Sequence, residues 1–274
     1  MTARSGDSTR HALGLANIGF VAASFLLALV AHALAYLSHE YAHSVMAWSL
    51  GWMERPFDID YGPPSVYNFI FLGDVSDNVS YAPIFAAGHG ISAAVIAFAG
   101  PFLGNGLLYF LLYAVVPWLS ARSSAVLPFI YWLSLMCAAN VWSYVPIRAI
   151  TTHADIALIA QGLGTSCWAL FPVLMLLSGF ITWHFFVRMF PKFQGVVAAK
   201  SSADAITLIA FTAFWYFSFF GGDGIGGSYG LVSQLLSITS RYFLFPLCVA
   251  YLSVRYLPLL TVGNKKAGSA DEVP

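Results

Sequence analysis

Residues 15–50 read LANIGFVAASFLLALVAHALAYLSHEYAHSVMAWSL, an apolar stretch that contains His-Glu-Tyr-Ala-His at positions 39–43. A helix of this length would extend about 54 Å at 1.5 Å per residue, whereas the hydrocarbon of a bilayer is about 30 Å thick. The stretch therefore predicts a membrane helix that tilts, bends or extends beyond the bilayer.

The two histidines at positions 39 and 43 can act together. On a helix, residues four apart share one face, so His39 and His43 can present two imidazole nitrogens to a single metal ion, with Glu40 beside it. A carboxylate in hydrocarbon is costly, so Glu40 requires a cavity, a metal or a partner. In an alternative interpretation the histidines form hydrogen bonds between helices and Glu40 is their buried partner.

The composition of the chain is that of a membrane protein. Apolar residues make up 59% of the sequence and charged residues 9%, with a mean hydropathy of +0.76, whereas soluble domains carry about 25% charged residues. These values exclude a soluble enzyme. The net charge of zero provides no basic patch for nucleic acid. The three cysteines lie in apolar segments and have no zinc-ribbon spacing.

Six apolar segments are long enough to cross a membrane, which predicts an all-α polytopic membrane protein. They cover residues 15–50, 83–116, 125–146, 167–188, 203–220 and 231–260. We divide the chain into a polar N-terminal tail (1–14), a catalytic membrane core (15–166), accessory transmembrane helices (167–260) and a polar C-terminal tail (261–274). The protein is therefore expected to be an integral, multi-pass membrane protein, and the sequence does not indicate its oligomeric state.

Lysine and arginine residues are distributed unequally between the two sides of these segments. One side would carry Arg4, Arg10, Arg122, Arg188, Lys192, Lys200, Lys265 and Lys266, and the other Arg55, Arg148 and Arg241. Positive residues favour the cytoplasm, so both termini are expected there and the loop at 51–81 on the opposite side.

Two further patches contain polar or small residues at helical positions. Residues 99–105, AGPFLGN, place Gly100 and Gly104 four apart, which allows a helix to approach closely, and end at Asn105. The third apolar segment is followed by His153 and Asp155, an imidazole and a carboxylate at the membrane end of that helix. Either can complete a zinc site.

Together, residues 39–43, residues 99–105 and the segment from Pro146 to Asp155 resemble the site-2 protease family of intramembrane zinc metalloproteases. The resemblance covers about residues 30–160. It implies a three-helix core that binds zinc through His39, His43 and Asp155, with Glu40 as the general base. It also implies that the substrate is a transmembrane protein in the lipid bilayer, cut in or near its membrane segment.

The chain departs from the family's pattern around the third ligand. Ser143 stands where the family has asparagine, Asp155 is followed by Ile156 rather than glycine, and Asp155 lies four residues further from Pro146 than usual. A three-histidine site with His153 is the alternative. The expected orientation of the motif helix is also opposite to that of familiar members.

Other polar residues have two interpretations each. Asn105 or Asn140 can donate a hydrogen bond to the oxyanion of a transition state, or bond one helix to another. His32 can support the site or simply be packed. Residues 56–61 and 66–72 predict a hairpin that could hold an unwound substrate, or an interfacial loop with aromatic anchors. The glycine-rich residues 222–227 are interpreted as a connector.

Other functions explain fewer of these features. A di-iron desaturase typically needs eight or more clustered histidines, and this chain has seven scattered ones. A transporter, a scaffold or an inactive site-2-protease-like protein would account for the six helices. Bound zinc would favour the protease, and its absence the other classes.

Overall fold

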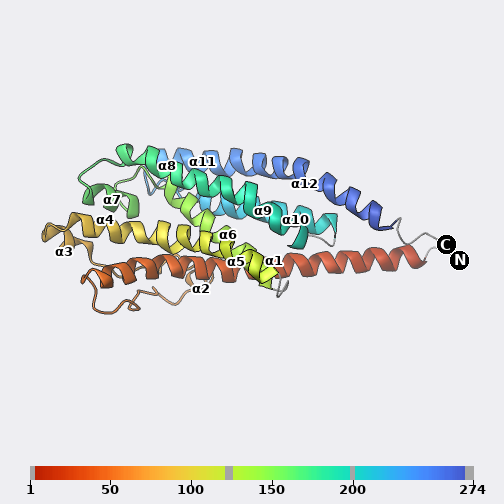
Figure 1. Cartoon of the computed structure of the whole chain (residues 1–274), viewed down its shortest axis with the longest axis horizontal. Coiled ribbons are helices and arrows are strands. Elements are labelled where there is room, and N and C mark those ends of the chain that lie inside the picture. The colour runs from red at the N-terminus through yellow and green to blue at the C-terminus, as the bar shows by residue number, and fades with distance from the viewer. Residues whose placement is uncertain (1–3, 121–125, 198–200, 269–274) are drawn as a thin grey trace.

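The computed structural model describes residues 4–120, 126–197 and 201–268 of the chain. Within these residues six helices are long and apolar enough to cross a membrane (Figure 1), and no strand is formed. The spans are Asn17–Ser49, Gly90–Leu119, Leu127–Ile147, Cys167–Gln194, Ser202–Gly222 and Leu231–Leu257. The prediction of an all-α, multi-pass membrane architecture is confirmed.

Helix α1 (Arg4–Ser49) is continuous through the first span and also through most of the predicted N-terminal tail. Its first turn and the last turn of α12 (Phe245–Gly268) lie at the same end of the bundle (Figure 1), as six crossings require. The outermost parts of the two predicted tails, residues 1–3 and 269–274, lie outside the described residues.

The second span begins later than the sequence predicts. Helix α3 (Tyr81–Ala86) is followed by a turn in which Gly88 has a φ of +78°, so the helix breaks before α4 (Gly90–Phe98) starts. The chain continues as the π-helical segment η1 (Ala99–Leu107) and as α5 (Leu108–Ser120). Wide turns of this kind are frequent at functional sites.

The third span, α6 (Leu127–Trp142), continues into the π-helical segment η3 (Ser143–Ile147). Val145 has extended backbone angles, and its freed carbonyl accepts a hydrogen bond from Ser178 Oγ. The helix therefore ends here, and the chain turns through residues 148–154 into the short helix α7 (Asp155–Gly162).

The C-terminal half adds three spans, each a helix interrupted by a wider or tighter turn. The fourth span consists of α8 (Cys167–His184), η4 (Phe185–Met189) and α9 (Phe190–Val197). The fifth consists of α10 (Ser202–Ala213), η5 (Phe214–Phe219) and η6 (Phe220–Gly222). The sixth consists of α11 (Leu231–Thr239), η7 (Ser240–Leu244) and α12.

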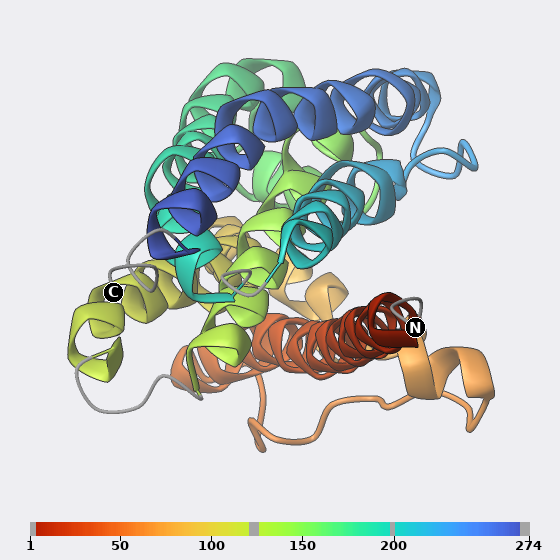
Figure 2. The same cartoon turned by 90° about the vertical axis from the view of Figure 1, so that its right-hand side faces the viewer.

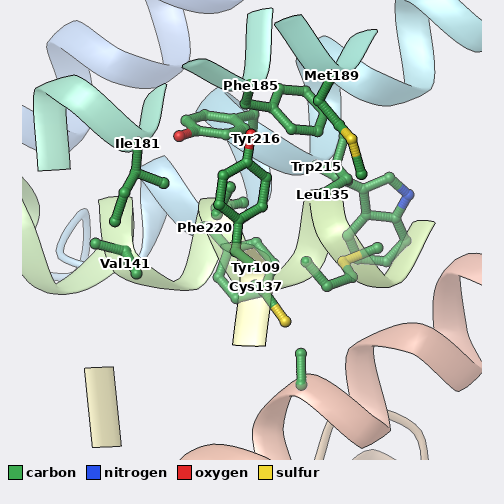
Figure 3. Packing of buried hydrophobic residues seen from close by; sticks show 14 of the residues in the cluster. Tyr109, Leu135, Cys137, Val141, Ile181, Phe185, Met189, Trp215, Tyr216 and Phe220 are labelled. Atoms are coloured by element: carbon green, nitrogen blue, oxygen red, sulfur yellow. The ribbon is translucent and has the colours of Figure 1, made fainter. Parts of the chain in front are cut away.

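Helix α6 is the centre of the bundle. It packs against α1, α5, α8, α9 and η5, and viewed along the bundle it lies between α1 and the C-terminal helices (Figure 2). Its span is 89% buried, against 28% for the first span and 17% for the last. The aromatic side chains of Tyr109, Phe185 and Tyr216 pack over it (Figure 3). The apolar outer faces of the surrounding helices are thus available to lipid.

The hairpin expected after the first helix is not confirmed. Residues Val66–Phe71 form a short helix, α2, although their sequence alternates in a strand-like manner. Ser65 caps the helix by accepting a hydrogen bond from the backbone N–H of Asn68, and the Asn68 amide donates to the carbonyls of Tyr61 and Pro63. These local side-chain bonds stabilise a turn instead of a ladder. Within the loop at 51–81, one isolated antiparallel β-bridge joins Asp60 to Ser76.

Candidate metal centre

The two histidines of the motif lie side by side in the interior. His39 and His43 project from the same face of α1, and each is 2% exposed. Their Nε2 atoms are 3.1 Å apart. Two ring nitrogens this close, both turned toward the same point, are arranged as a pair of metal ligands.

Asp155 completes the group. Its Oδ2 atom lies 3.2 Å from His39 Nε2 and 3.3 Å from His43 Nε2. Asp155 is the first residue of α7, so the end of the third span brings it to α1, and α1 and α6 are packed neighbours. The prediction that the 153–155 turn meets the histidine pair is confirmed.

His153, the alternative third ligand, lies elsewhere. Its side chain is exposed, and its ring stacks on Tyr229 with centroids 4.9 Å apart. Among the residues that the structure describes, His39, His43 and Asp155 are the group that can hold a metal ion. The geometry thus selects Asp155 over His153.

The Asp155 oxygen that faces the histidines is placed where a metal ligand could lie. Oδ2 is buried, and apart from these two imidazole nitrogens it has no polar partner within the described part of the chain. Burial raises the pKa of Asp155, but positive charge on His43 and His39 and hydrogen bonds from their rings lower the pKa below its usual value. An ionised, buried oxygen with two imidazole nitrogens beside it fits a cation at this position.

The outer nitrogen of each ring is held in place. His43 Nδ1 donates to the Ile96 carbonyl at 2.7 Å, and His39 Nδ1 lies 3.2 Å from the Asn105 amide. A backbone carbonyl only accepts, so His43 Nδ1 carries a proton, and in the neutral ring the Nε2 lone pair points to the site. Metal-binding histidines characteristically have such a partner on the outer nitrogen.

Asn105 also connects two helices. Its amide nitrogen lies 3.1 Å from Asn140 Oδ1 on α6, while its own oxygen has no partner among the described residues. Oxygen and nitrogen of an amide are assigned from hydrogen bonding, and the reverse assignment of both amides would let Asn105 Oδ1 accept from His39 Nδ1 and from Asn140. Both asparagines therefore lie on the outer side of the His39 ring and bond η1 to α6.

Two glycines of η1 make room for the histidines. A Cβ atom at Gly100 would lie 2.1 Å from His43 Nε2 and 2.7 Å from His39 Nε2. At Gly104 it would lie 2.5 Å from the Ser38 carbonyl and 2.9 Å from the His39 Cα. The close approach predicted from the Gly100/Gly104 pair is confirmed, and Gly100 keeps the space beside the ligand atoms free.

Glu40 is 7% exposed, next to the ligand His39 on α1. Its carboxylate has no hydrogen bond to any residue in the described ranges, whereas its backbone carbonyl accepts from Ser44 Oγ at 3.2 Å. The same hydroxyl lies 2.8 Å from the Asp77 carbonyl, which ties the loop to the motif helix. The side chain of Glu40 thus remains available to a water molecule or a substrate.

A cavity of about 420 Å³ reaches His39 from the side of the C-terminal half. This cavity is not evident from the sequence, because its walls come from segments far apart in the chain, including the glycine-rich residues interpreted as a connector. The available signal was a charge within an apolar segment, at Arg241. His32 also lines the cavity, and its Nε2 bonds to the Phe71 carbonyl at 3.0 Å, so it attaches α2 to α1.

Comparison of the chain with protein-family models, with curated proteins and with solved structures gives no match. The interpretation of the site therefore depends on its own geometry and on the sequence motifs that form it.

Proposed function

We propose that this protein is an intramembrane zinc metalloprotease of the site-2 protease type, which hydrolyses peptide bonds in or near transmembrane segments of membrane proteins. The observation that carries the proposal is the buried triangle of His39 Nε2, His43 Nε2 and Asp155 Oδ2, with sides of 3.1–3.3 Å. Glu40 is adjacent to this triangle, and the site belongs to a bundle of six candidate membrane spans.

Zinc is the metal that suits these three ligands. Ligand atoms about 2.0–2.2 Å from zinc at tetrahedral angles are about 3.3–3.6 Å from one another. The observed separations are close to that spacing. Two imidazoles and one carboxylate also form the ligand set of one group of catalytic zinc sites, in which the fourth position stays open.

The chemistry divides between the metal and the protein. Zinc, when bound, lowers the pKa of a water ligand toward about 7 and polarises a peptide carbonyl. Glu40 accepts a proton from the attacking water while the water oxygen forms its bond to the carbonyl carbon. When the carbon–nitrogen bond breaks, the Glu40 carboxyl returns that proton to the leaving amine. His39 and His43 hold their Nε2 lone pairs inward through the contacts of their Nδ1 atoms.

Asn105 is a positioning residue in this account. Its contact with His39 Nδ1 places it on the side of the ring opposite to Nε2. One of the two roles expected from the sequence, donation to an oxyanion, requires a side chain on the inner side; the other, a hydrogen bond between helices, agrees with the Asn140 contact. We therefore assign Asn105 to the orientation of His39.

The test is hydrolysis by purified protein. The protein in detergent is incubated with a panel of transmembrane peptides, and the products are identified by mass spectrometry. We expect cleavage by the wild type with about one zinc per chain, and none by Glu40→Gln. Zinc without cleavage of any peptide would indicate an inactive member of the class, and absence of zinc would indicate a transporter or scaffold.

A further inference from the structure

The cavity beside His39 is more polar than a pocket between membrane helices needs to be. It is lined by Asn140 and Ser143 of the third span and by Asp223, Tyr229 and Arg241 of the C-terminal half, together with Arg148. Charged groups in such a location are costly unless each has a partner or a function.

Arg148 has its partner within the protein. Its Nε atom lies 3.0 Å from Asp223 Oδ2, which also accepts a hydrogen bond from Ser143 Oγ at 2.8 Å. Its Nη1 atom donates to the Tyr229 hydroxyl at 3.2 Å. The guanidinium lies 3.9 Å from the centroid of the Tyr144 ring. Arg148 and Asp223 therefore balance each other's charge, and Asp223 is not available to neutralise a second cation.

Arg241 has no such counter-ion. Its Nε and Nη2 atoms both donate to the Ser218 carbonyl, at 3.1 and 3.0 Å. Across the described ranges no carboxylate lies within 4.0 Å of it. A guanidinium has five N–H groups, so about three remain after these two bonds. The wall of the cavity thus carries one positive charge in excess.

The fold makes a specific place for this guanidinium. A Cβ atom at Gly222 would lie 2.4 Å from Arg241 Nη2 and 2.6 Å from its Cζ. The guanidinium therefore lies directly on the backbone of Gly222, and a side chain at this position would have to displace it. This contact fixes one edge of the planar group and leaves the remaining N–H groups for another acceptor.

We propose that Arg241 determines substrate specificity by binding a carboxylate of the peptide substrate in the cavity beside His39. The proposal rests on the proposed function for the identity of the ligand as a peptide. A guanidinium binds a carboxylate through parallel N–H bonds with more directional specificity than an ammonium group. The position of the cavity beside a metal ligand favours a group near the bond that is cut, either an acidic side chain or the carboxyl terminus.

The experiment measures binding, so that it does not depend on hydrolysis. The Glu40→Gln protein in zwitterionic detergent is titrated with fluorescent transmembrane peptides in which a single Glu is moved along the sequence, each paired with the Gln peptide. The same peptides with free and amidated carboxyl termini separate the two sources of the carboxylate. We expect one Glu position, or the free terminus, to bind about 10- to 100-fold more tightly than its neutral partner.

The variants separate recognition from structural support. In Glu40→Gln/Arg241→Gln the ratio should fall to about 1, and a Gly222→Ala change, which displaces the guanidinium without removing its charge, should lower it similarly. A residue that only supported the fold would weaken both peptides by the same factor and leave the ratio unchanged. Arg255 of α12 is exposed and does not line the cavity, so Arg255→Gln should keep the full ratio.

Two outcomes would overturn the proposal: equal binding of every charged and neutral pair, or an unchanged ratio after Arg241→Gln. Failure of the proposed function gives a different result. In that case the wild type cleaves no peptide, yet the protein binds the peptide with a carboxylate more tightly than its neutral partner, and Arg241→Gln abolishes this preference. The protease assignment then fails, and Arg241 still recognises a carboxylate.

Discussion

The Nδ1–H group of His43 on α1 donates a hydrogen bond to the backbone carbonyl of Ile96 on α4 at 2.7 Å. Because a carbonyl oxygen cannot donate, this contact requires a proton on Nδ1, and the neutral ring then directs its Nε2 lone pair toward His39 and Asp155. A backbone carbonyl of the second span thus orients a candidate ligand on the first span. The candidate metal centre therefore depends on helix packing as much as on the motif.

Asp155 is expected to be essential for metal binding, and His153 is not. Asp155→Ala removes one of three ligands and should lower the zinc content of purified protein at least about 10-fold. His153→Ala, in the same turn but exposed, should keep about one zinc per chain. Metal analysis by mass spectrometry measures both. Loss of zinc in His153→Ala with retention in Asp155→Ala would move the third ligand to His153.

Gly100→Ala should weaken metal binding although glycine supplies no ligand. The added Cβ would lie 2.1 Å from His43 Nε2, so the ring must leave its position. We expect an affinity for zinc lower by about 10- to 100-fold, measured by competition with a chelator. Gly179→Ala is the matched control, since a Cβ there meets nothing within 4 Å. Equal affinities of the two variants would show that the histidine rings do not occupy these positions.

Asn105→Ala distinguishes orientation of His39 from stabilisation of an oxyanion. If Asn105 orients the ring, its loss should lower zinc affinity by about 10- to 100-fold, because partners on the outer nitrogen of a ligand have effects of this size. With zinc in excess, most of the activity should then return. Normal zinc affinity combined with a kcat lower by about 100-fold would instead assign Asn105 to the oxyanion.

Glu40→Gln should separate metal binding from catalysis. The amide has the shape of the carboxylate but cannot accept the proton of water, so we expect normal zinc content and peptide hydrolysis slower by about 100-fold or more. Glu40 makes none of the contacts between the candidate ligands. His43→Ala is the complementary variant, and it should lose both zinc and peptide hydrolysis. Full activity in Glu40→Gln would remove it from the mechanism.

Features that depend on residues close together in the sequence are predicted better than features that depend on contacts between distant segments. The spacing of His39 and His43 is local to one helix, and it predicts correctly that both rings share a face. The six spans follow from hydropathy. The position of Asp155 next to those rings was implied by a family resemblance, because no local pattern connects the turn after the third span to the first.

Features determined by tertiary packing or by single side chains were missed. Residues 66–71 alternate like a strand, but the hydrogen bonds of Ser65 and Asn68 stabilise a helix. Asp223 meets Ser143 and Arg148 only because the fifth span packs on the end of the third. Sequence spacing contains no information on that contact, so the glycine-rich residues before Tyr229 were interpreted as a connector rather than as a wall of the cavity.

The X-ray absorption spectrum of zinc in the purified wild-type protein tests the central claim most directly, since it reports the atoms that bind the metal. We expect a four-coordinate zinc with only nitrogen and oxygen neighbours at about 2.0–2.2 Å, two of them imidazoles, and the same spectrum for Glu40→Gln. In Asp155→Ala, which lacks one of the three ligands, most of the zinc itself should be lost. A sulfur neighbour at about 2.3 Å, or a preparation without zinc, would contradict the account.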